Sequence, residues 1–193
     1  MKALQHLPAG YEKIYSVDLQ KNKKIAVGIN VLAVLIAVIM VVPMLFYVPI
    51  ATLFDMERGL LPYFLRFAVL IVGMILYMIL HELVHGIAMK CCGTQKVQYG
   101  FTGLYAFAGS SDYYDKRSYI TIALAPVIVF AVIFAAVNMI VPTQWFWVIY
   151  ILQVVNISGA AGDAFVTAKF SKMPKDILVH DTGVGMTVYS KEA

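Results

Sequence analysis

Residues 61–89 read LPYFLRFAVLIVGMILYMILHELVHGIAM, and only Arg66 and Glu82 among them carry a formal charge. A helix needs about 20 mostly apolar residues to cross the hydrocarbon of a bilayer, and this stretch is long enough. Its last third nevertheless holds the ionisable side chains of His81, Glu82 and His85. The stretch therefore predicts a membrane-spanning helix that carries a polar cluster near one end.

Three further stretches of similar length and character lie on either side of this one. The chain is 61% hydrophobic and 13% charged, with a mean hydropathy of +0.80, whereas soluble domains average roughly 25% charged residues. We therefore expect an all-α membrane protein, a bundle of about four transmembrane helices that forms one domain over residues 1–193. The expected spans are 25–50, 61–89, 119–141 and 145–168.

The segments outside the spans are more polar. Residues 1–24 form a polar lead-in that differs from a cleavable signal peptide, and residues 169–193 form a polar tail. Between helices two and three, glycines interrupt the helical pattern while Val97, Tyr99 and Phe101 alternate with polar or small residues. A period of two is typical of a strand, so we expect a short β-hairpin there. An aromatic-rich loop that anchors the helix ends is the alternative.

The formal net charge of +4 does not indicate nucleic-acid binding, because the basic residues lie at segment ends and form no stripe with interleaved aromatic residues. The two connections on the opposite side hold only Arg58 and, just inside span two, Arg66. By the positive-inside rule, we expect a multi-pass protein with both termini and the 90–117 loop in the cytoplasm. The residues that set this orientation are Lys13, Lys21, Lys23, Lys24, Lys90, Lys96, Lys116, Arg117, Lys169, Lys172 and Lys175.

The sequence His81-Glu82-Leu83-Val84-His85 carries the chemistry. Residues four apart share one face of a helix, so His81 and His85 can offer imidazole nitrogens to one metal ion, with Glu82 beside them as a base for a water molecule. The alternative is a pair of hydrogen-bonded core histidines with Glu82 as a buried partner. This alternative is less favoured inside a membrane, because ionisable groups there cost several kcal/mol and usually mark a functional site.

Zinc at a catalytic site takes three protein ligands, and Asp163 is the expected third. Of the acidic residues, only Glu82 and Asp163 lie within the expected spans. His81 and Asp163 each lie about 27 to 30 Å along an inward-running helix, which places both near the cytoplasmic edge of the hydrocarbon. An ion pair between Asp163 and Lys169 is the alternative. The rival third ligands in polar sequence are His6, His180, Asp112 and Asp115.

Asn156, Gly159 and Asp163 fall at i, i+3 and i+7, a polar and small-residue stripe that permits close approach to helix two. Asn156 could contact the substrate carbonyl or hold a ligand in place, or it could make a hydrogen bond that packs the helices. Both roles stay open. Cys91 and Cys92 follow His81 by about 15 Å of helix, so they are not favoured as ligands.

The motif at 81–85, followed by a hairpin and by the stretch Asn156-Ile157-Ser158-Gly159-Ala160-Ala161-Gly162-Asp163, is similar to the site-2 protease class of intramembrane metalloproteases. That class carries Asn-x-x-Pro before a zinc-binding Asp-Gly. Here Gly159 stands in place of the proline, one residue fewer separates Asn156 from Asp163, and no glycine directly follows Asp163. The resemblance implies zinc held by His81, His85 and Asp163.

Nearly the whole chain resembles a bacterial family of small four-span zincin peptidases. The resemblance includes Ala123-Leu124-Ala125-Pro126, the stretch from Asn156 to Asp163, and the tail from Lys175 to Val179 and from Asp181 to Gly185. It implies a bacterial plasma membrane.

The sequence as a whole indicates a zinc (Zn²⁺) endopeptidase at the inner edge of the bilayer. Its expected partners are the lipid bilayer and a peptide or membrane-protein substrate, held extended by strand addition along 97–107. The expected metal ligands are His81, His85 and Asp163, and the expected catalytic residues are Glu82 and Asn156. A non-catalytic metal-binding module that holds a membrane partner is the rival reading, and Glu82 favours the enzyme because binding alone needs no base.

Overall fold

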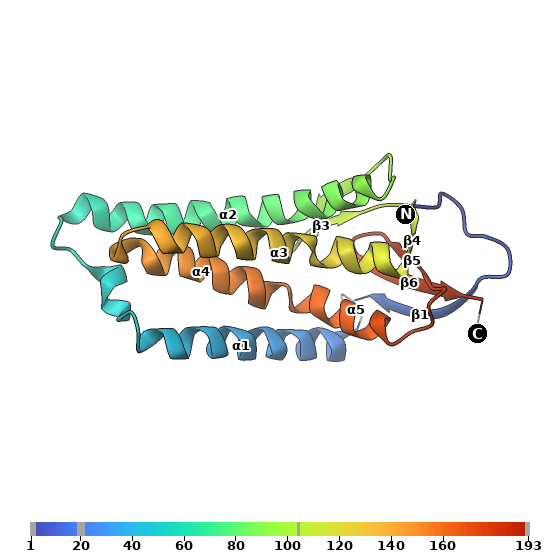
Figure 1. Cartoon of the computed structure of the whole chain (residues 1–193), viewed down its shortest axis with the longest axis horizontal. Helices are drawn as coiled ribbons and strands as arrows, with labels where there is room; N and C mark the ends of the chain where they lie inside the picture. Colours follow the sequence, from blue (N-terminus) through green and yellow to red (C-terminus); the bar gives the residue numbers. More distant parts are fainter. Residues whose placement is uncertain (1–2, 19–21, 104, 192–193) are drawn as a thin grey trace. The chain divides into compact units, whose positions relative to one another are not determined.

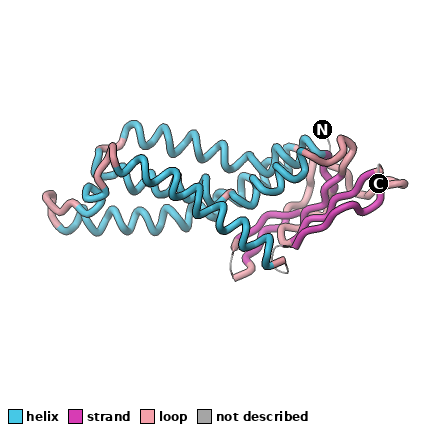
Figure 2. The backbone as a smooth tube through the Cα atoms, turned by 90° about the horizontal axis from the view of Figure 1, so that it is seen from below, coloured by secondary structure: helices cyan, strands magenta, loops and turns pink. Residues whose placement is uncertain are grey.

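The computed structural model describes residues 3–18, 22–103 and 105–191. The chain divides into two compact units. One, here called the helical unit, holds residues 30–80 and 127–161; the other, called the mixed unit, holds residues 1–29, 81–126 and 162–193. Figure 1 labels the elements along the chain, and Figure 2 colours helices and strands separately. The prediction of a single domain over 1–193 stays a prediction.

Four helical segments are long and apolar enough to cross a membrane, and each overlaps one predicted span. The fourth consists of two helices, with a break at Ala160 where one continuous helix over 145–168 was expected. The helices are α1 (Lys23–Leu45), η1, a short 3-10 helix (Ile50–Phe54), α2 (Leu60–Cys91), α3 (Lys116–Ile140), α4 (Thr143–Gly159) and α5 (Ala161–Ser171).

Helix α1 shows most clearly that these helices expose apolar side chains. None of its 23 residues is buried, although nearly all are apolar. Val34 and Ile39, for example, are exposed by 63% and 70%. A contiguous apolar surface of this extent is unfavourable in water, so the four helices are compatible with a multi-pass membrane protein.

The helical unit has its own core around α4. Trp147 and Val148 are almost completely buried and pack with Leu70 of α2 and Leu53 of η1. The indole nitrogen of Trp147 donates to the carbonyl of Pro49 over 3.3 Å, so the short helix after α1 is held against α4.

The mixed unit contains a four-stranded antiparallel sheet in the order β1-β6-β5-β4, whose strands are labelled in Figure 1. Its strands are β1 (Glu12–Asp18), β4 (Tyr113–Asp115), β5 (Leu178–Asp181) and β6 (Gly185–Ser190). The prediction of an all-α fold with a single hairpin is therefore wrong: the polar lead-in and the polar tail pair with each other as β1 and β6. The strands are short, and β1 and β4 pair with strands far away in sequence, so local periodicity gives little signal for them.

Three helices bury one side of this sheet. Val179 and Val188 of the sheet are fully buried and pack with Phe170 of α5, Ile122 of α3 and Met89 of α2. The ends of α2, α3 and α5 are thereby fixed around one core, and the candidate site lies on these three helix ends.

The predicted hairpin is present between α2 and α3. It consists of β2 (Gln98–Phe101) and β3 (Ala106–Gly109), with Tyr99 opposite Ala108. The hairpin lies against α2: a Cβ added to Gly86 would stand 1.9 Å from the Tyr99 hydroxyl. The alternating residues therefore indicated a strand correctly, and Gly86 leaves room for it.

Candidate metal centre

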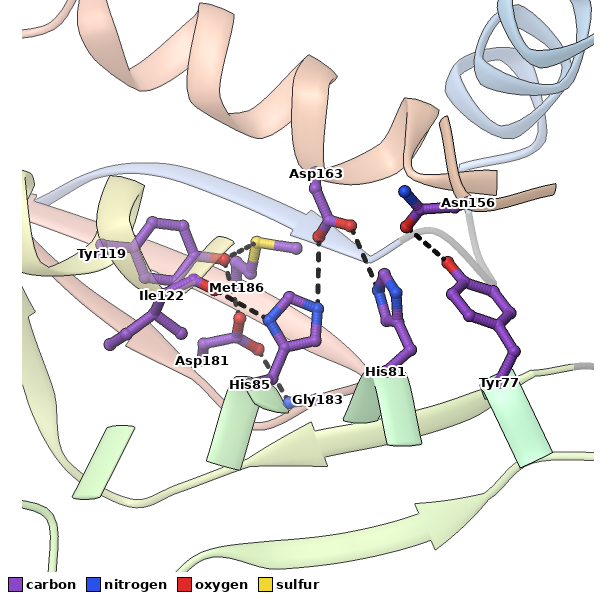
Figure 3. A network of polar contacts seen from close by, with 10 residues as sticks. All are labelled: Tyr77, His81, His85, Tyr119, Ile122, Asn156, Asp163, Asp181, Gly183 and Met186. Atoms are coloured by element: carbon purple, nitrogen blue, oxygen red, sulfur yellow. Dashed lines mark hydrogen bonds and ion pairs between the residues drawn. The ribbon is translucent and has the colours of Figure 1, made fainter. Parts of the chain in front are cut away.

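His81 and His85 lie one helical turn apart in α2, and their side chains point to the same side (Figure 3). Their ring centroids are 4.9 Å apart, with the rings at 78° to each other. Each side chain is only 12% exposed. Two nearly buried imidazoles this close together can both bind one metal ion.

Asp163 faces both imidazoles from the first turn of α5. Its two carboxylate oxygens lie 3.7 Å from Nε2 of His81 and 3.8 Å from Nε2 of His85. One ligand atom from each of the three residues lies within 4.8 Å of the other two, and the described residues contain no other such group. All three belong to the mixed unit.

These separations suit zinc. With ligand bonds of about 2.1 Å and tetrahedral angles, two zinc ligands stand about 3.4 Å apart, and the observed nitrogen–oxygen distances are within a few tenths of this value. Two imidazoles and one carboxylate also form a common ligand set of catalytic zinc, with a fourth position left for water. The residues present therefore fit the ion that the motif implies.

The orientation of His85 is set by a backbone group. Its Nδ1 lies 2.9 Å from the carbonyl oxygen of Ile122 in α3. A carbonyl oxygen can only accept a hydrogen bond, so Nδ1 carries the hydrogen and donates, and the lone pair of Nε2 faces Asp163. This is the tautomer that a metal ligand needs.

Glu82 follows His81 on α2 and faces the hairpin. Its carboxylate accepts a hydrogen bond from the backbone N–H of Ala108 on β3, and the residue is half-buried. The hairpin therefore holds the carboxylate beside the two histidines. A carboxylate in this position can take up a proton from a water molecule next to the metal ligands.

Asn156 lies in the helical unit and is fully buried. Its amide nitrogen donates to the carbonyl of Val127, and its oxygen accepts from the Tyr77 hydroxyl over 3.1 Å (Figure 3). These contacts join α2, α3 and α4, as the helix-packing role requires. The catalytic role of Asn156 stays a prediction. At Gly159 an added Cβ would meet nothing within 4 Å, so this glycine of the predicted stripe is not a site of close packing.

The rival ligands have other contacts. His180 stacks on Tyr113 with ring centroids 5.0 Å apart, and burial lowers its pKa. Asp115 accepts hydrogen bonds from the backbone and side chain of Ser118 and so caps the start of α3. Among the residues that the structure describes, the cluster consists of His81, His85 and Asp163. The predicted alternatives His180, Asp115, His6 and Asp112 do not belong to it.

One carboxylate near the site was missed. Asp181 ends β5 and accepts a 2.7 Å hydrogen bond from the Tyr119 hydroxyl of α3 (Figure 3). Burial, with a smaller contribution from the charge of Asp163, raises its pKa to about 6. The sequence Asp181-Thr182-Gly183 after an apolar run indicates a turn, but only the folded chain brings that turn to this helix.

A family model described as "Putative zincin peptidase" matches residues 74–178. This range includes the motif at 81–85, the hairpin and Asp163, although not Asp181. The similarity to the site-2 protease class stays a prediction.

A protein of Pyrococcus woesei, described as "Uncharacterized 24.7 kDa protein in gap 5'region", is 31% identical over 127 residues. The matched part covers 61% of this chain and 53% of the relative, so it spans about half of the relative's length. No solved structure matches the chain. The family match covers more than half of the sequence, including the two histidines and the aspartate that face one another in the structure. The chain therefore belongs to the family of zincin peptidases that this model describes.

Proposed function

We propose that this protein is a membrane-embedded zinc endopeptidase that hydrolyses peptide bonds of membrane or membrane-adjacent proteins near the cytoplasmic face. The observation that carries the proposal is the meeting of His81, His85 and Asp163 around one point, with Glu82 beside them, in a chain with four membrane-length helices. Membership of a zincin peptidase family supports the same reaction class.

The roles follow from the chemistry of each group. His81, His85 and Asp163 would hold the ion, and a bound zinc ion supplies the Lewis acidity that polarises a water molecule and the scissile carbonyl. Glu82 would accept the proton of the attacking water and pass it to the leaving amine. The hydrogen bond from Ala108 keeps that carboxylate next to the ligands.

The position along the membrane is part of the proposal. His81 stands 21 residues after the start of α2, which corresponds to about 31 Å of helix and so to the far edge of the hydrocarbon. The basic residues beyond the end of α2 favour the cytoplasmic side for that edge. A substrate would therefore be cut where its helix leaves the bilayer.

The substrate must be extended before it can present a peptide bond. Strand β2 pairs only with β3 among the described residues, and strand addition along its other edge would hold a peptide extended beside the hairpin. We therefore place the substrate along the hairpin.

The first experiment combines metal analysis with cleavage of a membrane peptide or unfolded casein by detergent-purified protein. We expect about one zinc per chain in the wild type and in Glu82→Gln, less in Asp163→Ala, and cleavage by the wild type alone. Glu82→Gln is the matched variant because it removes the base and keeps the size of the side chain.

Two outcomes would change the proposal. If zinc binds but Glu82→Gln cleaves as the wild type does, the proposed base is wrong. If zinc binds and neither protein cleaves any of these substrates, the result favours a non-catalytic module that binds metal and a membrane partner.

A further inference from the structure

Asp181 is a carboxylate that the reaction proposed above does not use. Its Oδ2 accepts the 2.7 Å hydrogen bond from Tyr119, and its Oδ1 accepts one from the backbone N–H of Gly183 over 2.8 Å. The sulfur of Met186 also lies 2.8 Å from the Tyr119 hydroxyl. Tyr119 is 3% exposed, so it cannot reach a substrate and acts on its neighbours.

The turn that carries Asp181 is held tightly against the hairpin. The backbone N–H of Ser110, directly after β3, donates to the Asp181 carbonyl over 2.9 Å. A Cβ on Gly109 would stand 2.3 Å from the carbonyl carbon of Thr182, and one on Gly183 would stand 2.2 Å from the Phe107 ring. The turn therefore contacts the strand whose Ala108 bonds to Glu82.

The same carboxylate is linked to a metal ligand through α3. Tyr119 and Ile122 are three residues apart and so lie on one side of the helix. The first bonds to Asp181, and the carbonyl of the second bonds to Nδ1 of His85. The bond to Asp181 therefore fixes the helical turn that orients the His85 ring.

The charges of Asp181 and Asp163 give a second link between Asp181 and the metal centre. The buried carboxylate of Asp181 lies close enough to Asp163 for the two charges to repel each other. A divalent cation held by Asp163 and the histidines would offset this repulsion, so the metal and the Asp181 charge stabilise each other.

We propose that Asp181 is a positioning residue of the metal centre, which acts through Tyr119 on the orientation of His85 and through its charge on the affinity for a divalent cation. The C-terminal strand pair is then part of the site. The inference rests on the proposed metal ligands and adds a residue beyond the range that the family model matches.

The test measures metal binding without cleavage. Zinc affinity is obtained by competition with a chromogenic chelator, and the coordination geometry from the visible absorption of the Co²⁺-substituted protein. The variants are Asp181→Asn and Tyr119→Phe. The control is Asp176→Asn, because Asp176 is also a carboxylate of the C-terminal segment, and its described hydrogen bonds are with the side chain of Ser190 and the backbone of Lys191.

We expect Asp181→Asn to bind zinc about tenfold more weakly, the lower end of the range for residues that orient a metal ligand. Tyr119→Phe is expected to weaken zinc binding in the same direction and to shift the Co²⁺ spectrum, because the turn of α3 that carries the Ile122 carbonyl loses its bond to Asp181. Asp176→Asn is expected to leave the affinity and the spectrum at wild-type values.

Equal zinc affinities and equal spectra in wild type, Asp181→Asn and Tyr119→Phe would overturn the inference and leave the peptidase proposal intact. Weaker zinc binding by these variants would support the inference. If Glu82→Gln also cleaved as the wild type does, the proposed peptidase mechanism would be wrong although the inference stood. Absence of metal binding in the wild type would overturn both.

Discussion

At the scale of single residues, the fit between the hairpin and the C-terminal turn depends on Gly109. An added Cβ there would meet backbone atoms of Thr182 and Gly183 at 2.3 to 2.5 Å, and backbone atoms cannot rotate away as a side chain can. We expect Gly109→Ala to destabilise the protein by about 2 kcal/mol, which is typical of forced overpacking. Thermal unfolding in detergent measures this, with Gly159→Ala as the control because nothing lies within 4 Å of its added Cβ. Equal melting temperatures for the two variants would contradict the close contact.

The pKa of Asp181 predicts how stability depends on pH. In the folded protein the pKa of Asp181 rises from 3.8 to about 6, so folding disfavours the charged carboxylate. The contribution of Asp181 to the free energy of unfolding is therefore largest below about pH 4. It decreases as the pH rises to about 6 and stays low above that pH. Two pKa units correspond to about 3 kcal/mol at most. With metal chelated, Asp181→Asn should therefore melt at a higher temperature than wild type at pH 8 but not at pH 4. A lower melting temperature at pH 8 would contradict this.

At the scale of elements, the sequence predicted the long helices and the hairpin after α2 but missed the four-stranded sheet, including the local pair of β5 and β6. The apolar runs and the alternation at Val97, Tyr99 and Phe101 gave the helices and the hairpin, because both have a short period along the chain. The pairing of β1 with β6 joins residues far apart in sequence, and a repeat of apolar residues along the chain cannot predict such a pairing. His81, Glu82, His85 and Asp163 were predicted from the motif and by elimination, whereas the position of Asp181 beside α3 is visible only in the folded chain.

The hairpin offers a test at this scale. If a substrate strand adds to β2, proline at Val97 or Tyr99 removes a backbone donor and should lower cleavage at least severalfold. The zinc content should stay at the wild-type value, since neither residue belongs to the metal cluster. Cleavage at the wild-type rate by both variants would remove strand addition from the proposal.

At the scale of the whole molecule, membrane insertion accounts for the exposed apolar surface. Because α1 has no buried residue, we expect the protein to stay in the membrane fraction after washing with high salt or alkaline carbonate and to be extracted only by detergent. Reporter fusions at the two termini should both be active on the cytoplasmic side. Release by alkaline carbonate, or reporters on opposite sides, would contradict this arrangement.

The order of the site residues along the chain has a consequence for synthesis. His81 and Glu82 are synthesised first, the third metal ligand follows about 80 residues later, and β5 and β6 come after it. A chain still on the ribosome after α2 has inserted holds the two histidines and the glutamate but lacks Asp163 and the strands that pair with β1 and β4. We therefore expect the proposed peptidase to become active only after the residues up to the end of β6 have been synthesised.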